Sequence, residues 1–181
     1  MKVYEVKSDV DNYQFLSQLS DKAMDVHQRI ENRRKLSHCK PVTEPLTPPD
    51  VYSQQPKLKR GDFWGFAPYS TFAVMPNSIS KVRIFLEEAG ELLPVLYKTE
   101  VFSVFNVLKC VDCVDPETEA LGIIHRSYIA NRVPSGIFRD LKGVHMFVSE
   151  FTGDPATEFK AYVEREKMTG LIFREVWSSE S

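Results

Sequence analysis

The stretch from Val101 to Val111 constrains the fold more than any other part of the sequence. Its side chains divide into two alternating sets, with Phe102, Val104, Asn106, Leu108 and Cys110 in one and Val101, Phe105, Val107 and Val111 in the other. Because alternate residues of a strand face opposite sides of the sheet, apolar side chains occur on both faces. An apolar pattern on both faces predicts a buried central strand.

Two segments have the apolar spacing of an amphipathic helix. The first covers residues 17–34, where apolar side chains recur at intervals of three and four residues. The second begins at Ser78 or Ser80, because either hydroxyl can cap the free amides of a first helical turn. Gly90 stands where a left-handed C-terminal cap is expected.

The clearest helix signal lies near the C-terminal end of the sequence. Asp154 fits the N-cap, and Pro155 fits the first helical position, where proline loses no hydrogen bond. Phe159, Tyr162 and Val163 supply an apolar stripe. Gly170 stands just past the expected end, so the pattern predicts a third helix within residues 154–170.

Strands and a proline-rich connection complete the expected fold. Strand-forming residues predict strands at residues 2–6, 92–97, 122–129, 143–149 and 171–177. Pro94 suits an edge strand or a bulge, and the prolines within residues 41–60 predict an irregular connection. Strands mixed with about three helices, without a regular βαβ alternation, predict an α+β fold with a mixed, mostly antiparallel sheet. We expect a single domain over residues 1–177 and a polar tail at 178–181.

Composition excludes several classes of protein. The 181 residues are 43% hydrophobic with a net charge of −2, which is ordinary for a globular domain. Charged residues interrupt every apolar run, so the chain lacks the roughly 20 consecutive apolar residues of a membrane helix. A nucleic-acid-binding domain is normally strongly basic. We expect a cytoplasmic protein, with no secretory signal at Met1 to Asp11, that binds neither membrane nor nucleic acid.

The cysteine pattern predicts reduced thiols. Cys39, Cys110 and Cys113 are an odd number in a chain without an export signal, which argues against a disulfide framework. Cys110 and Cys113 have the Cys-x-x-Cys spacing, but they follow an apolar strand rather than open a helix, and a zinc site would need a second pair of ligands. We expect a buried Cys110, Cys113 in the following turn, and neither metal nor cofactor.

Hydrolytic catalysis has weak support in the sequence. His125 and His145 could combine with a serine and a carboxylate, the candidates being Ser127, Ser149, Glu150 and Asp154. The chain has no Gly-x-Ser-x-Gly elbow, no His-Glu-x-x-His and no phosphate-binding glycine loop. The sequence therefore indicates a protein that is not an enzyme.

An aromatic cluster is a candidate for protein contacts. Phe63, Trp64, Phe66 and Tyr69 lie within seven residues. Their spacing favours a loop packed onto the core, and the alternative is an exposed hot spot for a partner, where aromatic side chains are enriched. We retain Trp64, Phe66 and Tyr69 as candidate contact residues.

The order of several short motifs resembles a known family. The motifs are a strand at Met1 to Val6, Lys59-Arg60-Gly61-Asp62-Phe63, Glu88-Ala89-Gly90-Glu91-Leu92-Leu93-Pro94-Val95, Phe105-Asn106-Val107-Leu108 with Val111-Asp112-Cys113-Val114-Asp115, and Thr169-Gly170-Leu171-Ile172-Phe173-Arg174-Glu175-Val176-Trp177. Together they resemble the immunity-protein family of bacterial polymorphic toxin systems typified by a myxobacterial protein. The resemblance spans most of the chain in the expected order.

The resemblance implies an antitoxin-like role. A protein of this kind binds a toxin encoded beside it and blocks that toxin, and the matched motifs contribute no catalytic residues. A toxin-facing surface would then lie outside the motifs. For a basic toxin, Asp112, Asp115, Glu117 and Glu119 would steer association. The alternatives are a non-enzymatic adaptor and, less favoured, a small hydrolase or thiol enzyme; no pattern indicates an oligomeric state.

Overall fold

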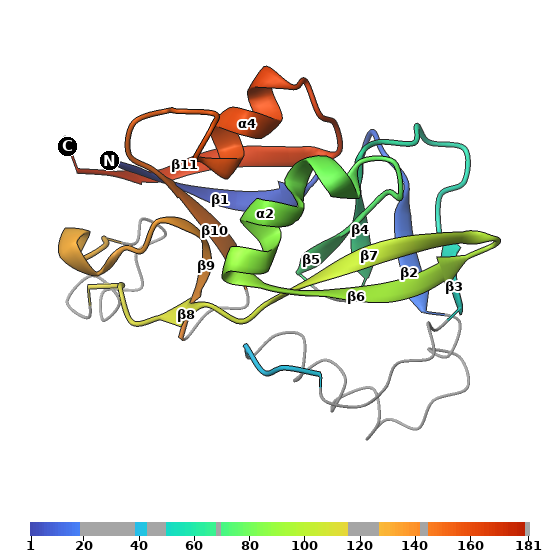
Figure 1. The fold of residues 1–181 in the computed structure, drawn as a ribbon, viewed down its shortest axis with the longest axis horizontal. Helices are drawn as coiled ribbons and strands as arrows, with labels where there is room; N and C mark the ends of the chain where they lie inside the picture. Colours follow the sequence, from blue (N-terminus) through green and yellow to red (C-terminus); the bar gives the residue numbers. More distant parts are fainter. Residues whose placement is uncertain (19–38, 43–49, 68–69, 116–126, 142–144, 180–181) are drawn as a thin grey trace.

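The computed structural model describes residues 1–18, 39–42, 50–67, 70–115, 127–141 and 145–179. Six strands close into a barrel in the order β2-β3-β6-β7-β5-β4. A second sheet of five strands, in the order β11-β1-β10-β9-β8, lies beside the barrel (Figure 1). The strands thus form two sheets instead of one, but the pairing is mixed and mostly antiparallel as expected, with parallel pairs at β2–β4, β3–β6 and β8–β9. The protein is a mixture of helix and strand, mostly sheet, as the α+β assignment requires.

The element bounds are as follows. The barrel consists of β2 (Phe15–Gln18), β3 (Asp50–Ser53), β4 (Phe63–Ala67), β5 (Thr71–Val74), β6 (Gly90–Tyr97) and β7 (Glu100–Val107). The five-stranded sheet consists of β1 (Lys2–Ser8), β8 (Cys110–Val111), β9 (Gly136–Asp140), β10 (Met146–Glu150) and β11 (Leu171–Ser178). The helices of the described ranges are α2 (Ile79–Ala89), α4 (Phe159–Arg165) and the 3-10 turn η2 (Ala130–Arg132).

The predicted central strand is confirmed over most of its length. Strand β7 pairs with β6 and with β5, and it is buried on both faces from Val104 onward. Its end differs from the prediction, because the backbone N–H groups of Leu108 and Lys109 both donate to the carbonyl of Ala89. The chain then continues as β8, which pairs with β9 in the other sheet. One apolar stretch thus contributes a strand to each sheet.

The two sheets share a core. Its largest cluster contains Phe63, Phe72 and Phe105 from the barrel together with Val6 and Val148 from the five-stranded sheet. Helices α2 and α4 both contribute buried side chains to this cluster. Edge-to-face contacts between its aromatic rings join the barrel to a helix, as between Phe63 of β4 and Phe159 of α4, whose ring centroids are 6.1 Å apart.

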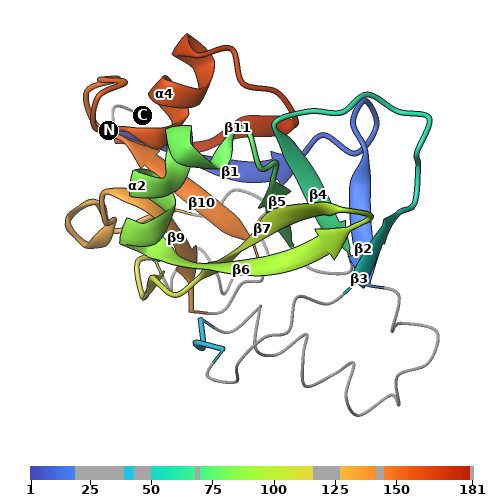
Figure 2. The same ribbon diagram turned by 45° about the vertical axis from the view of Figure 1, so that its right-hand side comes forward.

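Strand β1 lies in the interior of the five-stranded sheet. It pairs antiparallel with β10 on one side and with β11 on the other, so the predicted strands at the start of the sequence, at 143–149 and at 171–177 are confirmed and form one unit. The two ends of the described chain meet there (Figure 2): the N-terminal ammonium of Met1 donates to Ser179 Oγ, and Ser179 N–H donates to the Met1 carbonyl, both at 3.0 Å.

The second predicted helix is confirmed as α2, but its flanking residues act differently. Ser78 Oγ donates to Asp62 Oδ1 at 2.6 Å, which ties the helix start to the barrel. Gly90 has φ −179°, so it is extended and begins β6 rather than forming a left-handed cap. A Cβ at Gly90 would lie 2.1 Å from the carbonyl oxygen of Asn106, so close packing against β7 explains the glycine.

The third predicted helix is shorter than expected. Asp154 caps a turn, with Ala156 N–H donating to Asp154 Oδ1 at 2.9 Å, and α4 begins only at Phe159. Lys167, at φ 52°, takes the left-handed position after the helix. Gly170, the expected cap, lies beyond the helix end and just before β11. It has φ +102°, and a Cβ there would lie 1.9 Å from the carbonyl oxygen of Phe63. Its role is close packing between β4 and β11, not helix capping.

Several further expectations need correction. The connection at 41–60 contains β3, and strands β5 and β9 were not predicted. Within 122–129 the structure describes 127–129, where Tyr128 forms an isolated bridge with Val114. The helix predicted at 17–34 falls mostly outside the described residues, and its first two residues belong to β2. The described part of the chain has two α-helices rather than three, and neither is long and apolar enough to cross a membrane.

Candidate functional site

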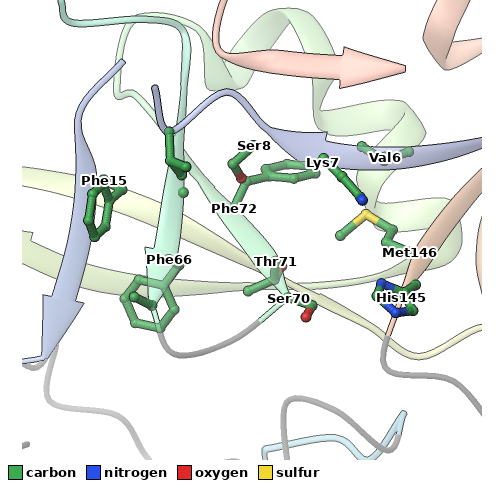
Figure 3. Close-up of a pocket in the computed structure, with 13 residues that line it drawn as sticks. Val6, Lys7, Ser8, Phe15, Phe66, Ser70, Thr71, Phe72, His145 and Met146 are labelled. Atoms are coloured by element: carbon green, nitrogen blue, oxygen red, sulfur yellow. The ribbon is translucent and has the colours of Figure 1, made fainter. Parts of the chain in front are cut away.

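A cavity of about 440 Å³ lies where the barrel meets the five-stranded sheet. Figure 3 shows its lining, which comes from the end of β1, from β2, β4 and β5, and from the start of β10. Small-molecule sites in proteins commonly have volumes of roughly 300–1,000 Å³, so the cavity is of ligand-binding size. We take it as the candidate functional site.

One end of the cavity is apolar. Phe15 on β2 and Phe66 on β4 lie together at this end (Figure 3), and Val10 and Ala67 also line the cavity. Gly65 keeps this wall compact, because a Cβ at that position would lie 3.1 Å from the Val10 Cγ1 atom. A side chain at position 65 would therefore require its neighbours Ser8, Val10 and Phe15 to shift by a few tenths of an ångström.

The other end of the cavity is cationic. Lys7 and His145 lie there beside Met146 (Figure 3). Both side chains contact the carboxylate of Glu5: Lys7 Nζ lies 3.3 Å from Oε2, and His145 Nδ1 lies 3.1 Å from Oε1. Arg174 Nη2 donates to the same carboxylate at 2.5 Å. These four residues, which we call the Glu5 cluster, place two permanent cations and one histidine around one carboxylate.

The middle of the cavity is fixed from behind by buried polar contacts. The hydroxyl of Thr71 donates to the backbone carbonyl of Phe105, and Arg139 Nη2 donates to the carbonyl of Ser70 at 2.8 Å. Arg139 is 1% exposed, and burial lowers its pKa to about 10, which still leaves it protonated at neutral pH. The Ser70–Thr71 wall is therefore rigidly positioned.

The cysteines differ from the prediction. Cys39 and Cys110 form a disulfide with their Cα atoms 6.0 Å apart, a separation that disulfides commonly span. The expectation of reduced thiols is wrong for this pair, because the fold brings together two residues far apart in sequence. Cys113 is a buried free thiol, and burial, with the nearby Asp140 and Asp112 carboxylates, raises its pKa to about 11. A thiolate is the reactive form, so this thiol is a poor nucleophile.

The residues considered for hydrolysis that lie within the described ranges contact other groups instead of one another. Ser149 Oγ donates to the carbonyl of Pro134 at 2.6 Å, and Glu150 contacts Tyr4 and Lys160. His145 instead belongs to the Glu5 cluster. His125 lies outside the described residues. The backbone carbonyl of Ser127 accepts a hydrogen bond from the N–H of Asp115. Within the described ranges, no group of three or more His, Cys, Asp or Glu side chains could hold a metal ion.

The aromatic contact candidates are part of the core. Trp64 is 0% exposed and Phe66 is 2% exposed, and Trp64 Nε1 donates to the Gly61 carbonyl at 3.0 Å while its ring packs against Phe102. The prediction that Trp64 and Phe66 form an exposed contact surface is therefore wrong. The alternative, that they pack onto the core, is confirmed, although they lie in strand β4 rather than in a loop. Tyr69 lies outside the described residues.

The acidic contact candidates are partly described. The side chain of Asp112 is 65% exposed and lies 3.9 Å from Arg132 Nη1. Asp115 is partly buried, and its backbone N–H donates to Ser127. Glu117 and Glu119 lie outside the described residues. The role of the acidic run stays a prediction.

Comparison with known proteins adds no family or relative. No protein-family model matches the chain, and no curated protein matches it either.

Proposed function

We propose that this chain is an immunity protein that binds and neutralises a bacterial toxin encoded nearby. The proposal starts from the motifs that resemble the immunity-protein family of polymorphic toxin systems. It draws support from one observation: motifs that are far apart in the sequence contact each other in the fold. Such contacts are what a shared fold would require of matched segments.

The first pair of motifs joins β4 to the turn before β11. Asp62 Oδ2 accepts the backbone N–H of Thr169 at 2.8 Å and its hydroxyl at 3.1 Å. Burial alone would raise the pKa of Asp62, but the hydrogen bonds from Ser78 and Thr169 outweigh it and lower the pKa below its ordinary value. Gly170 then packs directly on the carbonyl of Phe63. The Gly-Asp-Phe and Thr-Gly sequences are thus parts of one contact.

The second pair of motifs forms the β6–β7 hairpin. Asn106 is 0% exposed, and its Nδ2 donates to Glu91 Oε1 at 2.8 Å. Gly90, one residue earlier, lies against the Asn106 carbonyl. The Gly-Glu and Phe-Asn sequences therefore depend on each other, as the first pair does.

Neutralisation by binding fits this chain better than catalysis does. The two cysteines of the Cys-x-x-Cys spacing are a disulfide partner and a buried thiol of raised pKa, so they supply no ready nucleophile. We propose that the protein meets its toxin in the cytoplasm. Disulfides persist mainly in oxidising compartments. The redox state of the Cys39–Cys110 pair in the cell therefore tests the cytoplasmic location, because a reduced pair would support it and a disulfide would count against it.

A growth assay with a binding assay tests the proposal. The product of the adjacent gene is expressed in a test bacterium with and without this protein, and the tagged protein is then isolated with its partner. We expect growth to be rescued and a stoichiometric complex to be recovered. A complex with a harmless neighbour would instead indicate an adaptor, and rescue without a complex would indicate an enzyme.

The acidic residues allow a sharper test within the same complex. Asp112→Asn with Asp115→Asn removes two negative charges, and Glu87→Gln is the control, an exposed carboxylate on α2 that pairs with Arg83. For a basic toxin we expect the double variant to slow association at low salt by about fivefold, because complementary charges mainly raise the on-rate. Equal association rates for both variants would exclude this surface from steering.

A further inference from the structure

We propose that the cavity binds a small amphipathic anion, a medium-length aliphatic chain that ends in one carboxylate. The inference goes beyond the toxin-binding role and does not depend on it. It rests on the separation of apolar and cationic side chains along one cavity of about 440 Å³.

The apolar end suits the chain of such a ligand. Phe15 and Phe66 lie on neighbouring strands that pair in parallel, Phe66 opposite Leu16 and Phe15 opposite Gly65. Phe72 and Met146 extend the apolar lining toward the other end. An aliphatic chain placed along these side chains leaves water, and the burial of apolar surface favours binding.

The cationic end suits the carboxylate. Lys7 and His145 both line the cavity, whereas the Glu5 carboxylate that contacts them lies behind the lining, with its side chain 5% exposed. Counting Lys7 and Arg174 as positive and Glu5 as negative, the Glu5 cluster has an excess of one positive charge before any protonation of His145. An incoming carboxylate meets this excess charge.

The Glu5 carboxylate also orders Lys7 and His145, the two side chains at this end of the cavity. It lies on β1 at a position opposite Phe147 of β10 and opposite Arg174 of β11, so it is held by both neighbouring strands. A carboxylate fixed in this way restricts the positions of Lys7 and His145. Ordering before binding reduces the side-chain entropy that a ligand would otherwise have to remove.

The polarity selects among three classes of ligand. A cation would be repelled by Lys7, and a neutral chain would gain only from the apolar end. An anion with an apolar chain gains at both ends, because Phe15 and Phe66 lie apart from Lys7 and His145 along the cavity (Figure 3).

Titration calorimetry with three probes of equal chain length tests the proposal. Sodium decanoate, decanol and decylammonium chloride are each added to the full-length protein below their aggregation concentrations. We expect saturable one-to-one binding of decanoate, about tenfold tighter than that of decylammonium, with decanol between them. No saturable binding of decanoate, or equal binding of decanoate and decylammonium, would overturn the proposal.

Two lysines of the same strand provide a matched pair of variants. Lys7→Met removes the cation at the cavity, and Lys2→Met removes a cation that pairs with Glu175 away from the cavity lining. The two lysine side chains are similarly exposed, 47% for Lys7 and 44% for Lys2. We expect Lys7→Met to weaken decanoate about three- to fivefold and leave decanol unchanged, because a partly exposed charge contact is modest. Lys2→Met should bind like the unmodified protein. Equal effects of both variants on decanoate would contradict the cationic end.

A third variant tests the apolar end. Ala67→Leu adds an isobutyl group in place of a methyl at a residue that lines the cavity beside Phe66. We expect it to weaken decanoate and decanol by the same factor, with circular dichroism showing the fold intact. If the folded variant bound both probes as tightly as the unmodified protein, the aliphatic chain of the ligand would not lie beside residue 67, and the proposed orientation would be refuted.

Discussion

Glu158 anchors the loop that precedes α4, and its replacement gives a quantitative test of the fold. One carboxylate oxygen accepts the backbone N–H groups of Phe151 at 2.8 Å and Thr152 at 3.0 Å, and the other accepts that of Gly153 at 2.6 Å. The residue is only 9% exposed. Three successive backbone donors therefore depend on one buried carboxylate.

The Glu158→Gln variant keeps the shape of the side chain and removes its charge. Its amide nitrogen would face the Gly153 N–H, so one hydrogen bond is lost and the other two become neutral. Hydrogen bonds to charged groups contribute about 1.5–3 kcal/mol each. We expect unfolding to become easier by about 2–3 kcal/mol, which lowers Tm by roughly 4–12 °C for a chain of this size.

The pH dependence of this difference follows from the pKa of Glu158. Burial alone would raise that pKa, but the three backbone donors and the Thr152 hydroxyl outweigh it and hold the pKa below its ordinary value. A lowered folded-state pKa stabilises the protein above the unfolded pKa of about 4.3 and loses that effect as pH falls through the folded value. The difference between the two proteins should therefore be constant from pH 7 to about 5 and shrink below about 4.

Urea unfolding followed by circular dichroism measures both quantities. The control is Glu164→Gln on the same helix, where the side chain is 56% exposed and pairs with Lys160 at 2.9 Å. Because the Glu164 carboxylate is exposed and Lys160 also contacts Glu150 at 3.4 Å, we expect the loss of this pair to cost under about 1 kcal/mol. A Glu158→Gln variant no less stable than the control, or a difference unchanged at pH 3, would refute the role given to the carboxylate.

Three further predictions concern packing and the cysteines. Gly170→Ala should destabilise the fold by about 3 kcal/mol or more in urea unfolding. Its φ of +102° is unfavourable for alanine, and the added Cβ would lie 1.9 Å from the Phe63 carbonyl oxygen. A neutral effect would disprove the close contact. Leu86→Ala should cost about 2–5 kcal/mol in the same assay, against under about 0.5 kcal/mol for Ile84→Ala, which is 75% exposed on the same helix; equal losses would contradict the assigned faces. Thiol titration of the unreduced protein should find almost no reaction when folded and only Cys113 when unfolded; more than one thiol in the unfolded protein would exclude the disulfide.

The spacing of apolar residues along the sequence correctly predicted those strands and helices that have a regular periodicity of their own. Strand β1, strand β11 and helix α2 have the expected periodicity and were found within two residues of their bounds. Strand β9 was missed because it carries Arg139 and Asp140 at buried positions, where charged residues argue against a strand. The glycines at 90 and 170 were interpreted as helix caps, because the carbonyls they approach belong to distant strands.

The cavity could not be predicted from the sequence. Lys7, Phe15, Phe66 and His145 belong to four strands or strand ends from two sheets, and no local spacing relates them. Each has an ordinary interpretation alone, as a strand lysine, a core aromatic or a half-exposed histidine. Their arrangement follows only from barrel closure and from the pairing of β1 with β10.

The position of β1 between β10 and β11 has a consequence for how the chain reaches its fold. Lys2 is paired with Glu150 and with Ser178, so β1 finds its partners only after the strands between them in the sequence have been made. The barrel strands β2 to β7 are complete much earlier in synthesis. Because pairing between residues distant in sequence is slow, we expect β1 to dock last and to be the strand that chaperones encounter unpaired.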